Sequence, residues 1–483
     1  MLSEFGGKPI EETYYQAHNF ETLTIADPFM GGGTPLLEAN RIGCNVIGTD
    51  INPMAAWIVR EAIEAIDIKE YSNAAESLLH QLSSEIGYLY KTRCPITGRT
   101  DADVKYFLWV KSGNCTSCNK IFDLFPSYLL AEDARHTSFV LICPSCGDLN
   151  DVVDHQEPGT CRCGVNLTID GPVSRNKCVC PHCGHANSAP LHGEGPPSHR
   201  LFAIEYHNPD LKDRSGRLFK KPDADDIAKA NEAEAELKKL TPSFVPDDVI
   251  PAGDESSRLH RWGYQRFKEL FNSRQLLGLE ASARIIDRVK DVRLRCALAT
   301  NLSDLLRYQN MLCRYDTMAL KSLDIFSIHG FPVGYIQVES NLLGIRNGHS
   351  LPVGSGGWIN IVEKYLKAKR YCTYPFEAVF EGKRKWILPI RGEWIGDKNP
   401  ARPAAHARSV NIRCASATET VLPPSSLDAV FTDPPYYGMV QYGELMQFCY
   451  VWLRKLMGKD FPGFELHTTQ RGSPMFIVAW RDR

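Results

Sequence analysis

Asp433, Pro434, Pro435 and Tyr436 close an apolar, strand-like segment, and together they could do chemistry. The two prolines fix φ and withhold two backbone donors, so the carbonyl groups of this turn are left to accept hydrogen bonds. Asp433 adds a carboxylate acceptor, and Tyr436 at the tip could lay its ring against a flat ligand. The alternative reading of these residues alone is a strand followed by a proline turn with a surface tyrosine.

A glycine-rich segment near the start of the chain is a second candidate site. LTIAD predicts a buried strand that ends at Asp27, and CNVIGTD predicts a second strand that ends at Asp50. The glycines at 31–33 lie between them, followed by a predicted helix with Thr34 as N-cap and Pro35 as its first residue. Glycines let a backbone approach a ligand, and a helix N-terminus offers N–H groups to an anion. This order predicts the opening of a doubly wound α/β nucleotide-binding sheet.

Eight of the sixteen cysteines fall into four close pairs, which is the spacing of zinc knuckles. Clustered cysteines in a long chain without a secretion signal favour metal binding over disulfides. We expect the first two pairs to form one four-thiolate site and the last two pairs another, with Cys178 or His185 as alternative ligands in the second. No histidine–carboxylate set with an open position accompanies them, so two structural zinc ions are expected. The predicted ligands are Cys115, Cys118, Cys143 and Cys146 for the first site and Cys161, Cys163, Cys180 and Cys183 for the second.

The two acidic motifs together resemble those of S-adenosylmethionine-dependent amino-methyltransferases. DPFMGGGT at 27–34 resembles their D-P-F-x-G-x-G-T cofactor motif, and DPPY at 433–436 resembles their catalytic motif. From Asp27 to about Glu465 the chain most resembles adenine-specific DNA methylases that carry a zinc ribbon. The resemblance implies a Rossmann-like methyltransferase fold, S-adenosylmethionine as cofactor and double-stranded DNA with a flipped adenine as substrate. It also implies partner proteins of a restriction-modification or defence system.

The resemblance assigns roles to single residues. Asp433 and the carbonyl of Pro434 would accept the N–H bonds of the base amine, so that its nitrogen can pyramidalise and direct a lone pair at the methyl group. Stacking of the base on Tyr436 is worth about 1–3 kcal/mol, which offsets part of the few kcal/mol needed to flip it. Asp50 would hold the ribose of the cofactor. The predicted catalytic residues are Asp433, Pro434, Pro435 and Tyr436, and the predicted cofactor residues are Asp27, Pro28, Phe29, Gly31, Gly33, Thr34, Asp50 and Ser416.

The elements that must position these residues are spread over the whole chain. We expect an α/β fold in which residues 1–92 and 406–483 are two parts of one methyltransferase domain. A zinc-ribbon insertion at 93–200 and a mostly helical target-recognition region at 201–405 would separate them. In the helical region Arg274 and Gln275 are expected at the surface, with contact to nucleic acid as the alternative. Because little sequence precedes Asp27 and the tail after about residue 465 departs from the family, the sheet is expected to be truncated at both ends.

Composition bounds the function classes. With 43% hydrophobic and 23% charged residues and a net charge of −2, the chain is that of an ordinary globular protein. This charge argues against coating of nucleic acid by bulk electrostatics but leaves room for a local basic groove. A signal peptide and an apolar run of about 18 residues are both missing, which predicts no membrane span and a cytoplasmic location. Two alternatives remain, an RNA base amine methyltransferase and a truncated, non-catalytic zinc-ribbon chain that binds nucleic acid.

Overall fold

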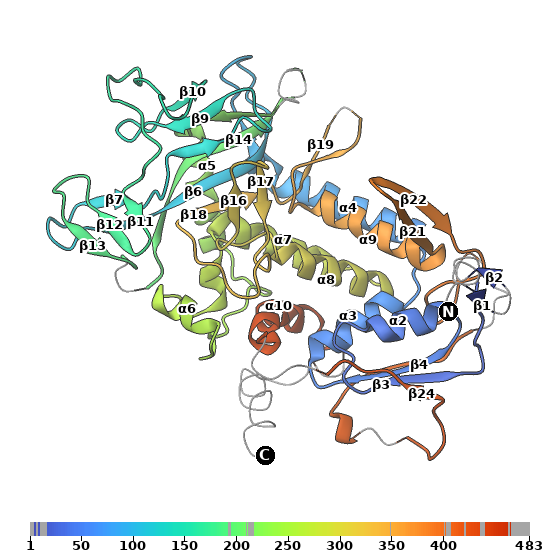
Figure 1. Ribbon diagram of the computed structural model, residues 1–483. Helices are drawn as coiled ribbons and strands as arrows, with labels where there is room; N and C mark the ends of the chain where they lie inside the picture. The colour runs from blue at the N-terminus through green and yellow to red at the C-terminus, as the bar shows by residue number, and fades with distance from the viewer. Residues whose placement is uncertain are drawn as a thin grey trace.

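The computed structural model describes residues 4–5, 8–9, 17–191, 195–208, 210, 217–347, 349–399, 401, 407–419, 422–434, 440–461 and 464. It is a mixed α/β structure, as the sequence predicts. A parallel sheet lies at one end, an antiparallel sheet with cysteine-rich loops at the other, and helices fill the space between them (Figure 1).

The parallel sheet contains four strands in the order β23-β4-β3-β24. Gly48 lets α2 lie directly on this sheet, because a Cβ atom there would come within 2.5 Å of Leu36 and 2.6 Å of the Met30 sulfur. These residues belong to a small core between the sheet, α2 and α3. The elements are β3 (Thr24–Asp27), α2 (Thr34–Arg41), β4 (Asn45–Asp50), α3 (Pro53–Ile63), β23 (Val410–Cys414) and β24 (Ala429–Val430).

The largest core lies in the helical layer. It joins Trp57 of α3 to Trp358 of α9 and Trp452 of α10, all three fully buried. The segments that contain α3 and α10, which lie far apart in the sequence, therefore pack on the helices between them. The helices of this layer are α4 (Ile68–Ile86), α7 (Ser273–Asp287), α8 (Val292–Leu306), α9 (Trp358–Thr373) and α10 (Tyr442–Met457).

The expectation for Arg274 and Gln275 is wrong, because neither residue is at the surface. Arg274 is 3% exposed and Gln275 is fully buried. The Arg274 guanidinium donates to both carboxylate oxygens of buried Glu339, at 2.6 and 2.9 Å, and lies 3.5 Å from the centroid of the Phe107 ring. A buried carboxylate partner and an aromatic face therefore hold this arginine inside the core.

The antiparallel sheet is not anticipated by the sequence. It runs in the order β15-β14-β6-β18, and β5 and β7 also pair with β6. The long strand β6 carries two buried lysines, Lys105 and Lys111, and Lys105 pairs with buried Glu205 at 2.5 Å. The strands are β5 (Lys91–Thr92), β6 (Ala102–Asn114), β7 (Ile121–Asp123), β14 (Ser198–His207), β15 (Arg217–Lys220) and β18 (Ile336–Ser340).

The remaining elements are short. The cysteine-rich region contains β8 (Leu129–Ala131), β9 (Phe139–Ile142), β10 (Leu149–Val152), β11 (Val173–Ser174), β12 (Lys177–Val179) and β13 (Ala186–Ser188). Four hairpins are formed by β1 (Glu4–Phe5) and β2 (Lys8–Pro9), β16 (Arg314–Asp316) and β17 (Lys321–Leu323), β19 (Ile345–Arg346) and β20 (Pro352–Val353), and β21 (Phe376–Glu381) and β22 (Arg384–Pro389). Helices α5 (Ala224–Lys239) and α6 (Ser256–Arg261) and the 3-10 turns η1 (Gly87–Tyr90), η3 (Phe267–Leu270) and η4 (Ala417–Glu419) complete the described set.

No helix in the described ranges is both long enough and apolar enough to cross a membrane.

Lys111 should make stability depend on pH. Burial lowers the pKa of its ammonium from 10.5 to about 7. Between these values the unfolded chain binds a proton that the folded chain does not, so the free energy of unfolding rises with pH through this window. The substitution Lys111→Met removes the titratable amine and with it the cost of burying its charge. We therefore expect the variant to be more stable than the natural chain at pH 7. The advantage should shrink as the pH approaches 10.5, as measured by urea unfolding at several pH values. A difference that does not vary with pH would contradict this account.

Candidate functional site

Four strand ends meet at one edge of the parallel sheet. Parallel pairing sets Ala26 of β3 beside Val430 of β24 and Asp50 of β4 beside Cys414 of β23. The N–H of Phe431 continues this alignment by donating to the carbonyl of Ala26 at 3.0 Å. The two candidate sites of the sequence, some 400 residues apart, therefore come to the same edge.

The glycine loop is joined directly to the second acidic strand end. The Asp50 carboxylate accepts the backbone N–H of Gly31 at 2.9 Å and that of Asn52 at 2.8 Å. Asp27 is 2% exposed and accepts the N–H of Phe29 at 3.0 Å, which tightens the turn after β3. The loop is therefore shaped by the two acids that precede and follow it, while Phe29 remains 43% exposed.

The helix after the loop begins one residue earlier than predicted. Gly33 is the N-cap of α2, with φ at +76°, and Thr34 is the first helical residue, so the assignment of Thr34 as N-cap is wrong. The left-handed backbone at this position favours glycine. A Cβ atom at Gly33 would also come within 2.5 Å of Val59 in α3. The cap is therefore a position where only glycine fits without rearrangement.

Burial raises the pKa of Asp50. The N–H groups of Asn52 and Gly31 act in the opposite direction, and the negative charge of Asp27 adds to the increase. Two backbone donors leave a carboxylate with further lone pairs to accept hydrogen bonds. Asp50 is half-buried and can therefore still receive hydroxyl donors from a ligand.

The other predicted residues lie around this edge as far as the described ranges reach. Ser416 follows β23, and its hydroxyl is 2.8 Å from that of Thr418. Asp433 and Pro434 are exposed and come directly after β24, which ends at Val430. Pro435 and Tyr436 fall outside the described residues.

One residue that sequence reasoning missed fixes α10, the helix that follows the Asp433 segment. The carboxylate of Glu444, in α10, accepts the backbone N–H groups of Asp254, Glu255 and Ser256 at 2.9–3.0 Å and the Ser256 hydroxyl at 2.8 Å. Gly253 makes room for it, since a Cβ atom there would lie 2.3 Å from this carboxylate. An isolated glutamate in an amphipathic helix gives no sequence signal for such a clamp.

Helix α10 also reaches the edge of the parallel sheet. The side-chain amide of Asn52 lies 2.9 Å from the sulfur of Met446. Asn52 is the N-cap of α3 and follows Asp50 by two residues. Helix α10 is therefore packed against the strand end that carries Asp50.

The eight paired cysteines form two groups of four, but the predicted grouping is wrong. The outer group joins the first knuckle to the last, and the inner group joins the two knuckles between them. Cys178 and His185 are in neither group, although Cys178 is buried nearby. The outer group is Cys115, Cys118, Cys180 and Cys183, and the inner group is Cys143, Cys146, Cys161 and Cys163.

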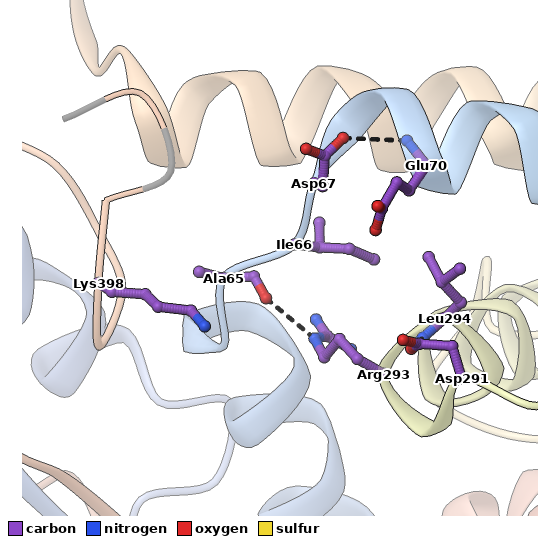
Figure 2. Close-up of a pocket in the computed structure, with 8 residues that line it drawn as sticks. All are labelled: Ala65, Ile66, Asp67, Glu70, Asp291, Arg293, Leu294 and Lys398. Carbon is purple, nitrogen blue, oxygen red and sulfur yellow. Dashed lines mark hydrogen bonds between the residues drawn. The ribbon is translucent and has the colours of Figure 1, made fainter. Parts of the chain in front are cut away.

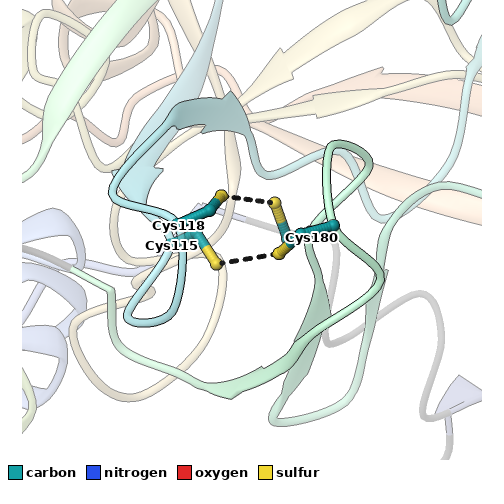
Figure 3. A group of neighbouring side chains, drawn as sticks. Cys115, Cys118 and Cys180 are labelled. Atoms are coloured by element: carbon teal, nitrogen blue, oxygen red, sulfur yellow. Dashed lines mark hydrogen bonds between the residues drawn. The ribbon is translucent and has the colours of Figure 1, made fainter.

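The sulfur geometry fits a tetrahedral metal ion. Figure 3 shows Cys115, Cys118 and Cys180 of the outer group pointing toward one another. Neighbouring sulfurs in the two groups are 3.5–3.8 Å apart. A tetrahedron with Zn–S bonds of about 2.3 Å has edges of about 3.8 Å, whereas a disulfide requires about 2.05 Å. Each group can therefore hold one structural metal ion, and the donor set suits zinc.

Backbone N–H groups and neighbouring thiols bias the protonation of these sulfurs. The N–H of Cys118 lowers the pKa of Cys115 to about 6. Although the N–H of Asp148 acts to lower it, burial and the neighbouring thiols raise the pKa of Cys146 to about 12. Four thiolates at such distances repel one another, so full ionisation of a group requires a cation among them.

The pocket in Figure 2 lies away from the sheet edge, beyond the C-terminal end of α3, and has a volume of about 350 Å³. Its arginine, Arg293, donates to both carboxylate oxygens of Glu61 and to the carbonyl groups of Glu64 and Ala65. Lys369 donates to three carbonyl groups of the same helix end. These cations cap α3 and complement its dipole, which gives them a structural role.

Comparison of the chain with protein-family models, with curated proteins and with solved structures gives no match. The observed class is thus a mixed α/β chain with a parallel sheet, a separate antiparallel sheet and two four-cysteine groups.

Proposed function

We propose that the chain is an S-adenosylmethionine-dependent methyltransferase that acts on the exocyclic amine of a DNA base, with adenine N6 as the favoured acceptor. The observation that carries the proposal is the meeting of two loops at one sheet edge. The glycine loop leaves β3 and the Asp433 segment leaves β24, and these two strands are neighbours in the sheet.

The strand order supports this assignment. Three strands run outward from β3 to β4 and β23, and the fourth, β24, lies on the other side of β3. In open parallel sheets, ligands bind outside the carboxyl ends of the strands where the order reverses. That reversal falls between β3 and β24, so the Gly31 loop and Asp433 flank it.

The residues at the edge fit the cofactor that the sequence motifs imply. A Cβ atom at Gly32 would meet nothing within 4 Å, so the loop leaves open space beside its backbone. The first turn of α2 directs N–H groups to the same side, and Asp50 is half-buried and held by two backbone donors. The loop at 31–33 would hold the carboxylate end of the cofactor and Asp50 its ribose. The bound cofactor would supply an activated methyl group on sulfur.

The chain's own residues would position the acceptor. A base amine is a poor nucleophile because its lone pair is delocalised into the ring. Acceptance of its N–H bonds by Asp433 and by the Pro434 carbonyl would localise that lone pair on nitrogen. Preorganised acceptors and a fixed approach distance are the main contributions that a protein can make to such a transfer.

Replacement of Asp433 tests the proposal. We expect Asp433→Ala to lower methyl transfer to adenine-containing duplex DNA by at least about 100-fold, the loss typical of one preorganised polar group. Binding of S-adenosylmethionine should change little, because Asp433 follows β24, whereas the residues that would hold the cofactor follow β3 and β4. Labelled-methyl transfer and calorimetric titration give the two readouts. Asp287→Ala, an exposed acid at the end of α7, is the matched control.

The outcomes separate the proposal from its alternatives. If the natural chain methylates tRNA and not DNA, the reaction is assigned correctly and the substrate is wrong. If the chain does not bind S-adenosylmethionine, the methyltransferase assignment fails. If Asp433→Ala transfers methyl groups as fast as Asp287→Ala, the role given to Asp433 is wrong.

A further inference from the structure

A second pocket, with a volume of about 320 Å³, lies between α6 and the loop that precedes β18. Arg258 and Arg261 of α6, Arg314 of β16 and Trp262 line it, together with apolar residues of the loop. No acidic residue is among the lining residues that the structure describes. A concave surface with three guanidinium groups suits an anion, and planar guanidinium groups match phosphate oxygens in pairs.

Two of the arginines, Arg258 and Arg314, retain hydrogen-bonding capacity toward a ligand. The Arg258 side chain is 45% exposed and meets Glu255 at 3.7 Å, which is long for an ion pair. Arg314 donates through Nη2 to the Ser327 hydroxyl at 3.3 Å, and its buried Nε has no partner among the described residues. The guanidinium groups of Arg258 and Arg314 therefore have N–H donors that these contacts do not occupy.

Trp262 provides an aromatic surface in the same pocket. Its ring packs edge-on against Tyr335 at 5.7 Å, and the Lys111 ammonium lies 5.5 Å from its centroid. Lys111 also donates to the carbonyl of Gly334, which lines the pocket. Trp262 is half-buried. An indole that is fixed by its neighbours and partly open to solvent is a platform on which a nucleobase can stack.

A series of direct contacts connects this pocket to the edge of the parallel sheet. Asn52, next to the Asp50 strand end, contacts Met446 of α10. Glu444 of the same helix is held by the N-terminus of α6, and the six residues of α6 span about 9 Å. Figure 1 shows α10 between α6 and the parallel sheet. The helix α6, which carries two of the pocket arginines, thus contacts α10, the helix that follows the Asp433 segment.

We propose that the arginines of this pocket bind neighbouring backbone phosphates of the nucleic-acid substrate and that Trp262 stacks one of its bases, outside the site of methyl transfer. The inference rests on the proposed function for the identity of the substrate. It gives the helical insertion a role in holding the strand that carries the target base. It also accounts for a local basic surface on a chain whose net charge is −2.

The test compares two triple variants of the full chain that lose the same charge. One is Arg258→Gln with Arg261→Gln and Arg314→Gln, and the control is Arg288→Gln with Lys290→Gln and Lys367→Gln, three exposed cations elsewhere. Affinity for a fluorescent DNA duplex is measured by anisotropy at several salt concentrations. We expect the pocket variant to bind at least about 10-fold more weakly and to lose up to about three units of salt slope, near one for each phosphate contact. The control should remain within about threefold of the natural chain.

Further arms keep the result interpretable. Arg258→Gln alone changes an exposed side chain and should lower the slope by about one unit, while Trp262→Leu should weaken binding with no change in slope. Thermal unfolding of every variant is compared with that of the natural chain, and single-stranded RNA of the same sequence identifies the favoured nucleic acid. Pocket variants that match the control in affinity and slope would overturn the inference. Its failure is distinct from failure of the proposed function, because binding of S-adenosylmethionine and methyl transfer are measured separately.

Discussion

Removal of metal from the two four-cysteine groups should unfold residues 115–191 and leave the helical layer folded. Apart from cysteines, the buried cluster around the inner group contains Leu141 and Leu167, and that around the outer group contains Phe122, Leu124, Val173 and Leu191. Structural zinc in small domains supplies about 10–16 kcal/mol of apparent folding free energy, which such cores cannot replace. The core formed by α7, α8 and α10 contains no residue of either group.

Hydrogen exchange measured by mass spectrometry with and without a strong zinc chelator would show this. Protection should be lost in peptides from 115–191 and retained in peptides from α7 and α8. Equal loss in both regions would mean that the metal ions support the whole chain. Unchanged protection in the cysteine-rich region would mean that the thiol groups do not need a metal ion.

Metal content also tests which cysteines belong together. Cys115→Ser combined with Cys180→Ser damages only the outer group, so this double variant should retain one ion. Cys115→Ser combined with Cys143→Ser damages both groups and should retain none. A grouping of consecutive knuckles predicts the reverse pattern. Zinc released on acid treatment and counted with a colorimetric indicator distinguishes the two arrangements.

Breaking the buried pair of Arg274 and Glu339 should cost about 3–5 kcal/mol of stability, the range for removing one partner of a buried ion pair. Glu339 accepts hydrogen bonds from Arg274, from the Trp109 indole at 2.9 Å and from the Asn272 amide at 2.7 Å. In Glu339→Leu the guanidinium remains buried beside Phe107 without its counter-charge. The urea midpoint of unfolding should fall accordingly.

Two controls make this prediction specific. Arg274→Met combined with Glu339→Leu removes both charges and should regain most of the loss, since an apolar replacement of a buried pair is often neutral. Glu234→Gln removes one partner of an exposed pair with Lys238 and should change stability by less than about 1 kcal/mol. If Glu339→Leu were no more harmful than Glu234→Gln, the pair would not be buried as described.

Local patterns predict the edge of the parallel sheet well. The strands predicted to end at Asp27 and Asp50 are β3 and β4, which end at those residues. Gly43, at φ +114°, follows the end of α2 as a terminating glycine should. These features depend on neighbours in sequence, and local propensity and turn chemistry are therefore sufficient to find them.

The features that sequence reasoning missed depend on distant partners. Each cysteine knuckle ends with a residue of positive φ, such as Gly147 or Gly184, so the four knuckles look alike and nothing local pairs them. Arg274, Lys105 and Lys111 have the side chains of surface residues, and distant partners such as Glu339, Glu205 and Trp262 explain their burial. Tertiary context, which a single sequence does not display, decides these cases.

The nesting of the cysteine groups sets an order of assembly. Cys146 and Cys161 are 15 residues apart, whereas Cys118 and Cys180 are 62 apart and enclose the entire inner group. Closing the longer span first would cost about 1 kcal/mol more in chain entropy. Once the inner group has bound its ion, the free chain between Cys118 and Cys180 is shorter, so closure of the outer group costs less. We therefore expect a newly made chain that meets too little metal to bind the inner ion first. Its outer group, which begins next to the end of β6, would then remain empty.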